Sequence, residues 1–118
     1  VLHADKSVDN VIIGTTVTVT VDRPLGSYHP EYKDMYYPIN YGYIEGVMAP
    51  DGEEQDAYIL GVNEPVDKFT GKIIVIVQRK DDVEEKRVVV PDGMRFLKDE
   101  IRQQIYFQEQ YFDSEIVM

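Results

Sequence analysis

The sequence has 118 residues, which suits a single domain over positions 1–118, and 43% of them are hydrophobic, which excludes a disordered acidic chain. Because 12 basic residues stand against 22 acidic ones, with a net charge of −10, we exclude nucleic acid and anionic membrane surfaces as partners. The absence of cysteine excludes disulfides and thiolate metal sites. No apolar run is long enough to span a bilayer, so we expect a cytoplasmic protein.

The first predicted element is a strand over residues 15–22. Valine stands at every second position from Val17 to Val21, and threonine or aspartate stands between, which is the pattern of a half-buried strand that ends at Asp22. Pro24 and Gly26 then break the alternation. We expect the tyrosine-rich stretch that follows, as far as Tyr43, to form a loop.

Three further strands are predicted over 57–62, 72–78 and 86–90. The segment 72–78 is nearly all β-branched and apolar, as in a strand that is buried on both faces. Turn signals separate these segments, at 50–52 and 63–65. Four strands at this spacing predict a small closed or partly open barrel.

A helix is predicted near the end of the sequence, over 98–112. Leu97, Ile101, Ile105 and Phe112 lie near one stripe of such a helix, so one face is apolar. We expect this amphipathic helix to pack on the barrel, which makes the fold class mostly β, within the α+β type.

The acidic segment DGEEQD, residues 51–56, is a candidate metal site. Mg²⁺ takes oxygen ligands and is usually held by a few carboxylates, which Asp51, Glu53 and Asp56 could supply. Gly52 permits a tight turn that would direct carboxylates on either side into one pocket. By spacing alone, an ordinary polar turn explains the segment equally well.

A second acidic run, DDVEEK at 81–86, leads into the strand 86–90. In an extended chain Asp82, Glu84 and Lys86 lie on one face, so two acids and an ammonium would form a row. The lysine could hold a phosphate oxygen while the acids hold metal. On composition alone, we favour a solvated hairpin end over this functional interpretation.

Other catalytic chemistries have no support in the sequence. No nucleophile elbow and no glycine-rich phosphate loop occurs, and there is no cysteine nucleophile. His3 and His29 are isolated, so neither is expected to bind zinc. Metal-assisted hydrolysis, in which cations activate a water molecule, is the chemistry that remains.

Four segments in order, YPINYGYI at 37–44, DGEEQD, DDVEEK before VVVP, and FQEQYF at 107–112, resemble the soluble inorganic pyrophosphatases of the barrel-fold family (family I). The chain is similar to a short, divergent member. The resemblance implies a small five-stranded OB-like β-barrel with a C-terminal helix. It also implies hydrolysis of pyrophosphate to two phosphates with Mg²⁺, or alternatively Mn²⁺, by an assembly of several copies, a homo-oligomer.

The resemblance also implies roles for individual residues. Asp51 and Asp56 match metal ligands, with Asp56 bridging two ions and the attacking water, and Glu53 matches the general base. The remaining roles are metal binding by Asp22, Asp82 and Glu84, and phosphate binding by Lys86, Tyr41 and Tyr111. Arg23, His29 or Lys33 could replace the cations of the family's longer hairpin, and our hypothesis assigns Arg23 to phosphate.

The sequence departs from the family pattern at five places. Glu53 is one methylene longer than the usual aspartate, and the acidic run before Lys86 is abbreviated. Glu54 stands where a proline is typical, Phe112 stands where a phosphate-binding lysine follows the tyrosine, and the segment 27–37 is shorter than the family's hairpin. Loss of phosphate-binding cations lowers transition-state stabilisation. Two alternatives therefore stay open: hydrolysis of another phosphoanhydride, either a nucleotide or polyphosphate, and a binding module that does not catalyse.

Overall fold

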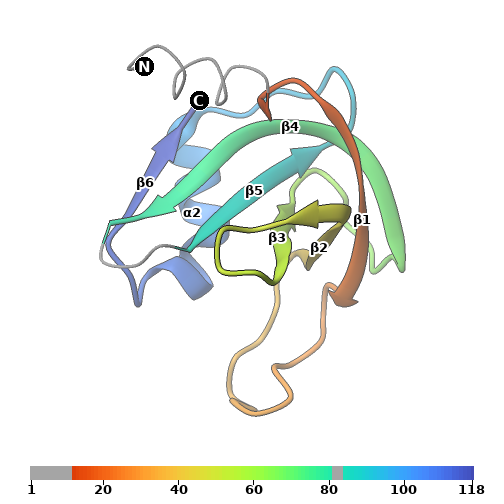
Figure 1. The fold of residues 1–118 in the computed structure, drawn as a ribbon. Coiled ribbons are helices and arrows are strands. Elements are labelled where there is room, and N and C mark those ends of the chain that lie inside the picture. Colours follow the sequence, from red (N-terminus) through yellow and green to blue (C-terminus); the bar gives the residue numbers. More distant parts are fainter. Residues whose placement is uncertain (1–11, 81–83) are drawn as a thin grey trace.

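The computed structural model describes residues 12–80 and 84–118. Strands β1 (Thr16–Arg23), β2 (Asn40–Met48), β3 (Glu54–Ile59), β4 (Lys68–Arg79) and β5 (Glu85–Val90) are followed by helix α2 (Lys98–Glu109) and strand β6 (Ser114–Val117). The sheet order is β1-β2-β3-β5-β4-β6, and an additional antiparallel pairing of β1 with β4 closes the first five strands into a barrel (Figure 1). The predicted mostly-β fold with a five-stranded barrel and a C-terminal helix is confirmed.

Strand β1 closes the barrel because it pairs along both of its edges. It pairs with β2 on one side, where Val21 lies opposite Gly42, and with β4 on the other, where Val17 lies opposite Gly71. A Cβ on Gly42 would lie 1.9 Å from the carbonyl oxygen of Thr20. Only glycine therefore allows the backbones of β1 and β2 to approach so closely.

The apolar residues form two clusters, one on each face of the sheet. Along β3, Ala57 and Ile59 belong to one cluster, which fills the barrel with Val19, Ile44, Ile73 and Val89. Tyr58, between them, belongs to the other cluster, which lies between the sheet and α2 and includes Ile101 and Ile105. The alternation of side chains along a strand thus divides the core into two layers.

The structure corrects the predicted loop that ran to Tyr43. Residues from Asn40 onward form β2, which pairs with β1 and with β3. Tyrosine favours strands, and Tyr41 is buried by the partners on both sides. The tyrosines were misread as loop residues because the segment itself does not alternate between apolar and polar residues.

The C-terminal helix is shorter than predicted. Helix α2 ends at Glu109, and Leu97, which caps its N-terminus, is 72% exposed. Phe112 lies beyond the helix, and the short strand β6 that follows, which the sequence did not predict, pairs with β4. No helix in the two described stretches of the chain is long and apolar enough to cross a membrane.

Candidate active site

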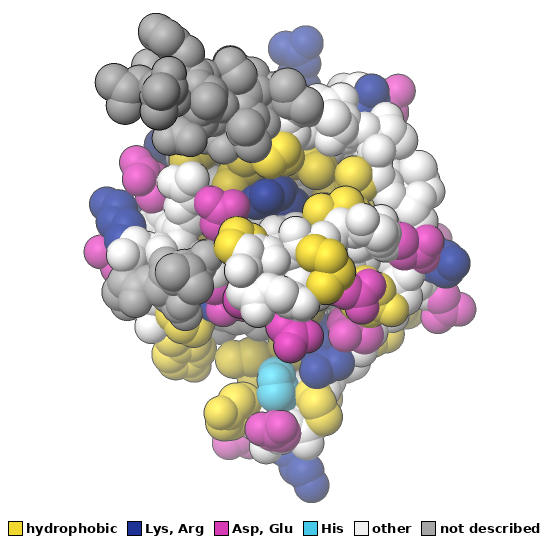
Figure 2. All heavy atoms as spheres, viewed as in Figure 1, with side chains coloured by type: hydrophobic (Ala, Val, Ile, Leu, Met, Phe, Trp, Pro, Cys, Tyr) yellow, Lys and Arg dark blue, Asp and Glu magenta, His cyan; other side chains and the backbone are white. Residues whose placement is uncertain are grey.

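An open pocket of about 730 Å³ lies where the barrel, the end of α2 and the connection between β1 and β2 meet. This connection, 24–39, protrudes from the barrel at the bottom of Figure 1. In the same view, Figure 2 shows hydrophobic, acidic and basic side chains mixed on the protruding segment. The lining residues include seven of the predicted site residues: Asp22, Arg23, Tyr41, Asp56, Glu84, Lys86 and Tyr111.

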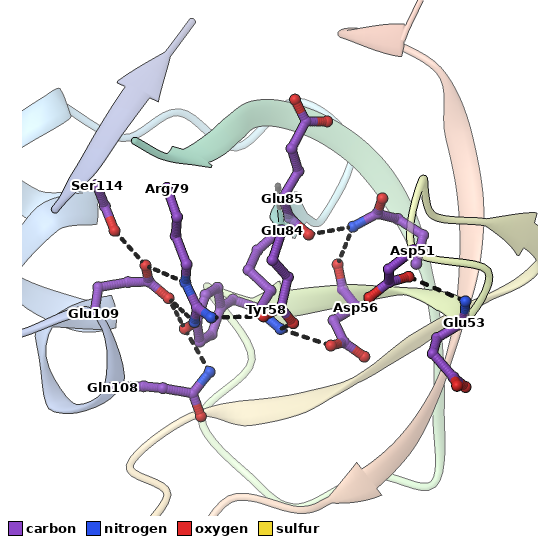
Figure 3. A network of polar contacts seen from close by, with 12 residues as sticks. Asp51, Glu53, Asp56, Tyr58, Arg79, Glu84, Glu85, Gln108, Glu109 and Ser114 are labelled. Carbon is purple, nitrogen blue, oxygen red and sulfur yellow. Dashed lines mark hydrogen bonds and ion pairs between the residues drawn. The ribbon is translucent and has the colours of Figure 1, made fainter. Parts of the chain in front are cut away.

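Lys86 lies between Asp56 and Glu84 in a cluster that lines the pocket, the Lys86 cluster. Figure 3 labels the two carboxylates, Asp56 and Glu84. Lys86 Nζ donates to Asp56 Oδ2 at 2.6 Å and to Glu84 Oε1 at 2.5 Å, and the Lys86 side chain is 3% exposed. Burial by itself would lower the pKa of Lys86, but Tyr41 and the two carboxylates outweigh this effect and raise it. Lys86 is therefore a fixed, charged donor at the pocket.

Asp22 and Arg23 reach the pocket from the end of β1. Burial raises the pKa of Asp22, Arg23 opposes this shift, and the negative charge of Asp56 adds to it. The Nε of Arg23 is buried and has no hydrogen-bond partner within the described residues. A buried donor of this kind is costly unless another group satisfies it, which a bound anion could do.

Tyr41 lines the pocket beside Lys86. Lys86 Nζ lies 5.5 Å from the centroid of its ring, within the range of a cation–π interaction. Burial raises the pKa of Tyr41 well above its ordinary value, so its hydroxyl keeps its proton at neutral pH. Tyr41 can therefore act as a neutral hydrogen-bond donor.

Sequence reasoning missed Arg79, which lines the pocket from the end of β4. Its side chain is 4% exposed and donates to Glu109 at 3.2 and 2.8 Å and to Glu84 Oε2 at 2.9 Å. The guanidinium carbon also lies 3.6 Å from the centroid of Phe112. A signal was present in the sequence, because Glu109 continues the buried stripe of Ile101 and Ile105 at intervals of four residues and needs a buried cation.

Glu109 joins Arg79 to three further residues in what we term the Arg79 cluster. Ser114 and Tyr58 donate their hydroxyls to Glu109, and Gln108 donates to the Tyr58 oxygen at 2.8 Å (Figure 3). Burial alone would raise the pKa of Glu109, but the hydrogen bonds from Arg79, Ser114 and Tyr58 lower it. This cluster holds the end of α2 on the barrel.

Three predicted site residues are not in the pocket as described. Asp51 Oδ1 accepts a hydrogen bond of 3.0 Å from the backbone N–H of Glu53, so the two residues form a turn before β3, and neither lines the pocket. Asp82 lies outside the described residues. Tyr111 lines the pocket and is 67% exposed.

The pocket contains oxygen donors of the type that bind hard divalent cations. Four carboxylates, from Asp22, Asp34, Asp56 and Glu84, line it together with three cationic side chains. Oxygen donors of this type bind Mg²⁺ and Mn²⁺. Within residues 12–80 and 84–118, no three acidic or histidine side chains are close enough to hold one ion. Asp56 and Glu84 lie close together, because both accept a hydrogen bond from Lys86 Nζ, and are therefore the best candidate pair of ligands.

Comparison with solved structures relates the fold to known enzymes. An inorganic pyrophosphatase from Ehrlichia chaffeensis matches with a TM-score of 0.65 and 19% identity over 87% of this chain and 85% of that chain. One from Coxiella burnetii gives 0.63 and 19% over 88% and 84%, and one from Neisseria gonorrhoeae gives 0.63 and 20% over 83% and 74%. The chain has the fold of the bacterial inorganic pyrophosphatases.

Sequence comparison does not extend this likeness. No protein-family model matches the sequence, and no curated protein matches it either. At 19–20% identity, the three solved structures establish a divergent pyrophosphatase fold for this chain.

Proposed function

We propose that the protein hydrolyses inorganic pyrophosphate to two phosphates, with Mg²⁺ or alternatively Mn²⁺ as the cofactor. The fold supports this proposal, and so does the single observation that Lys86 is buried and charged at a pocket wall between Asp56 and Glu84. A fixed ammonium beside carboxylates provides a phosphate-binding donor next to oxygen ligands for a cation.

The charge of the pocket supports a requirement for a cation. Its acidic side chains outnumber Arg23, Arg79 and Lys86, so the described lining does not by itself attract a highly charged anion. Asp56 and Glu84 would hold the metal ion, with Asp22 beside them. When bound, such an ion lowers the pKa of a water molecule and neutralises charge on the leaving phosphate.

The protein's own residues bind and orient the substrate. Lys86 donates to a phosphate oxygen, and the protonated hydroxyl of Tyr41 donates to another. Arg23 offers a guanidinium whose Nε lacks a partner among the described residues. Tyr111, at the rim, would contact the outer phosphate. The roles of Asp51 and Asp82 as metal ligands and of Glu53 as general base stay predictions from the resemblance.

The test is the release of phosphate from pyrophosphate in the presence of Mg²⁺, comparing the unmodified protein with Asp56→Asn. Removing a group that stabilises developing charge costs roughly 10²–10³ in kcat, so a loss of this size is expected. Asp67→Asn, which changes an aspartate that does not line the pocket, is the matched control and should retain the rate. Equal rates for Asp56→Asn and the unmodified protein would refute the proposal.

Location and assembly belong to the same proposal. We expect a cytoplasmic homo-oligomer that acts on a small phosphoanhydride without a nucleic-acid or membrane partner. Sedimentation of the purified protein measures the assembly directly, and a monomer at all concentrations would contradict it.

A further inference from the structure

The pocket is larger than an ion such as pyrophosphate requires. Its volume of about 730 Å³ lies within the range of roughly 300–1,000 Å³ that is typical of sites for drug-sized ligands. The Lys86 cluster and Arg23 occupy the side formed by the barrel. The other side, which we term the loop wall, consists of His29, Tyr32, Asp34, Met35 and Tyr37 from the protruding connection between β1 and β2.

The loop wall is not built to bind phosphate. None of its five residues is a lysine or arginine, and the wall carries the carboxylate of Asp34. A second phosphate group at this wall would meet a negative charge with no compensating cation from the wall itself. An uncharged part of a ligand is therefore favoured there.

An aromatic surface is held in place on this wall. His29 Nδ1 accepts the backbone N–H groups of Glu31 and Tyr32 at 3.0 and 3.1 Å, which fixes the orientation of the imidazole ring. The ring centroid lies 4.9 Å from that of Tyr32 and 6.5 Å from that of Tyr37, and His29 and Tyr37 are stacked with an interplanar angle of 19°. The rings are thus ordered before a ligand binds, which reduces the entropy that binding costs.

Two rings offer exposed surface for stacking. Tyr32 is 66% exposed although it lines the pocket, and Tyr111, in the turn that follows α2, is exposed to a similar degree. Any nucleobase can stack on an exposed tyrosine ring, because every base has a flat π-face. Because Nδ1 of His29 accepts hydrogen bonds, the neutral ring carries its proton on Nε2, which can donate. The carboxylate of Asp34 offers an acceptor. A base that has acceptor nitrogens and an amino group could therefore bind to His29 and to Asp34.

We infer that the pocket accepts a nucleoside di- or triphosphate, with its phosphates at the Lys86 cluster and Arg23 and its base on the loop wall. This inference rests on the proposed function for the phosphate end, and it adds a substrate class and a base-binding site. Attack by water on the terminal phosphorus breaks the phosphoanhydride bond and releases inorganic phosphate and a nucleotide that is one phosphate shorter. The attacking water loses its protons to solvent and phosphate.

The test compares three substrates in the presence of Mg²⁺: pyrophosphate, inorganic tripolyphosphate and adenosine triphosphate. Tyr32→Ala is expected to lower kcat/KM for adenosine triphosphate about tenfold, because stacking on one aromatic ring is worth about one to two factors of ten in affinity. The values for pyrophosphate and tripolyphosphate should change less than twofold. Tyr28→Ala is the matched control, because Tyr28 is an exposed tyrosine of the same connection that does not line the pocket.

The outcomes separate this inference from the proposed function. Turnover of pyrophosphate but not of adenosine triphosphate, or equal losses for all three substrates in Tyr32→Ala, would overturn the inference and leave the proposed function intact. If no substrate is hydrolysed, the proposed function fails, and calorimetric titration decides the inference. The inference is supported if adenosine diphosphate binds at least tenfold more tightly than pyrophosphate and if Tyr32→Ala abolishes this difference. It is overturned if the difference in affinity is less than tenfold, or if the substitution leaves the affinity unchanged.

Discussion

The two ionic clusters beside the pocket contain similar charges in different settings. In the Arg79 cluster both charged partners, Arg79 and Glu109, are buried, and three protein donors satisfy the Glu109 carboxylate. In the Lys86 cluster the lysine is buried, but Asp56 and Glu84 remain about a third exposed at the pocket. A cluster with saturated, buried partners holds the fold together, whereas one with exposed carboxylates can still exchange its partners for a ligand.

The largest expected effect on stability arises when the Arg79 cluster loses its acid. Glu109→Gln keeps the shape of the side chain but leaves the buried Arg79 without its main counter-charge. Loss of one partner of a buried pair should lower the free energy of unfolding by about 3 kcal/mol, measured by urea denaturation. A double substitution, Arg79→Met with Glu109→Leu, should recover most of the loss, and equal stability of Glu109→Gln and the unmodified protein would contradict the role of this pair.

The second effect concerns activity, and it separates the two clusters. Lys86→Met removes the ammonium that we assign to a phosphate oxygen, so kcat should fall roughly 10²–10³-fold in the phosphate-release assay. The neighbouring carboxylates are partly exposed and can be hydrated, so stability should fall less than in Glu109→Gln. If Lys86→Met lowered the free energy of unfolding as much as Glu109→Gln does and left kcat unchanged, the two clusters would have the same structural role.

A smaller effect is expected in acid. The pKa of Glu109 in the folded protein is lowered below its usual value of 4.5, so the folded state holds its proton less tightly than the unfolded state does. The stability that this group contributes is present above pH 4.5 and is lost as the pH falls through the lowered pKa. Urea denaturation from pH 7 to pH 3 should show this loss in the unmodified protein and a shallower decline in Glu109→Gln. Identical slopes would remove Glu109 as a source of the pH dependence.

The smallest effect is expected at an exposed ion pair that belongs to neither cluster. Lys68 Nζ lies 3.0 Å from Glu45 Oε2, and both side chains are well exposed. Solvent and salt screen such pairs, so Lys68→Gln should leave the midpoint of urea denaturation unchanged within error. A clear shift would mean that exposure does not separate weak pairs from strong ones in this protein.

The strands with a clear local pattern of apolar residues were predicted from the sequence. The alternating valines of β1 and the apolar run of β4 correspond to observed strands. Strand β2 was missed, although it forms a hairpin with the next strand, β3, because its own sequence does not alternate between apolar and polar residues. The four-residue strand β6 was missed because it is short and its partner, β4, lies far away in the sequence. Long-range pairing decides such segments, and one sequence carries little information about it.

In the candidate site, too, the features that depend on distant partners could not be predicted from the local sequence. Composition alone favoured a solvated hairpin end for Glu84 and Lys86, and only the resemblance assigned them to a site that the pocket brings together with Asp56. Arg79 could not be recognised from its own position, because its role depends on Glu109, thirty positions away on another element. The spacing of Glu109 from the buried isoleucines of α2 was the signal that could have revealed the pair.

Glu84, a member of the Lys86 cluster, also connects it to the Arg79 cluster, since one of its carboxylate oxygens accepts from Lys86 and the other from Arg79. A ligand that drew this carboxylate toward itself would remove a counter-charge from Arg79 and loosen the attachment of α2 to the barrel. We therefore expect occupancy of the pocket to be coupled to the end of the helix, where amide hydrogen exchange of residues 105–109 would register it.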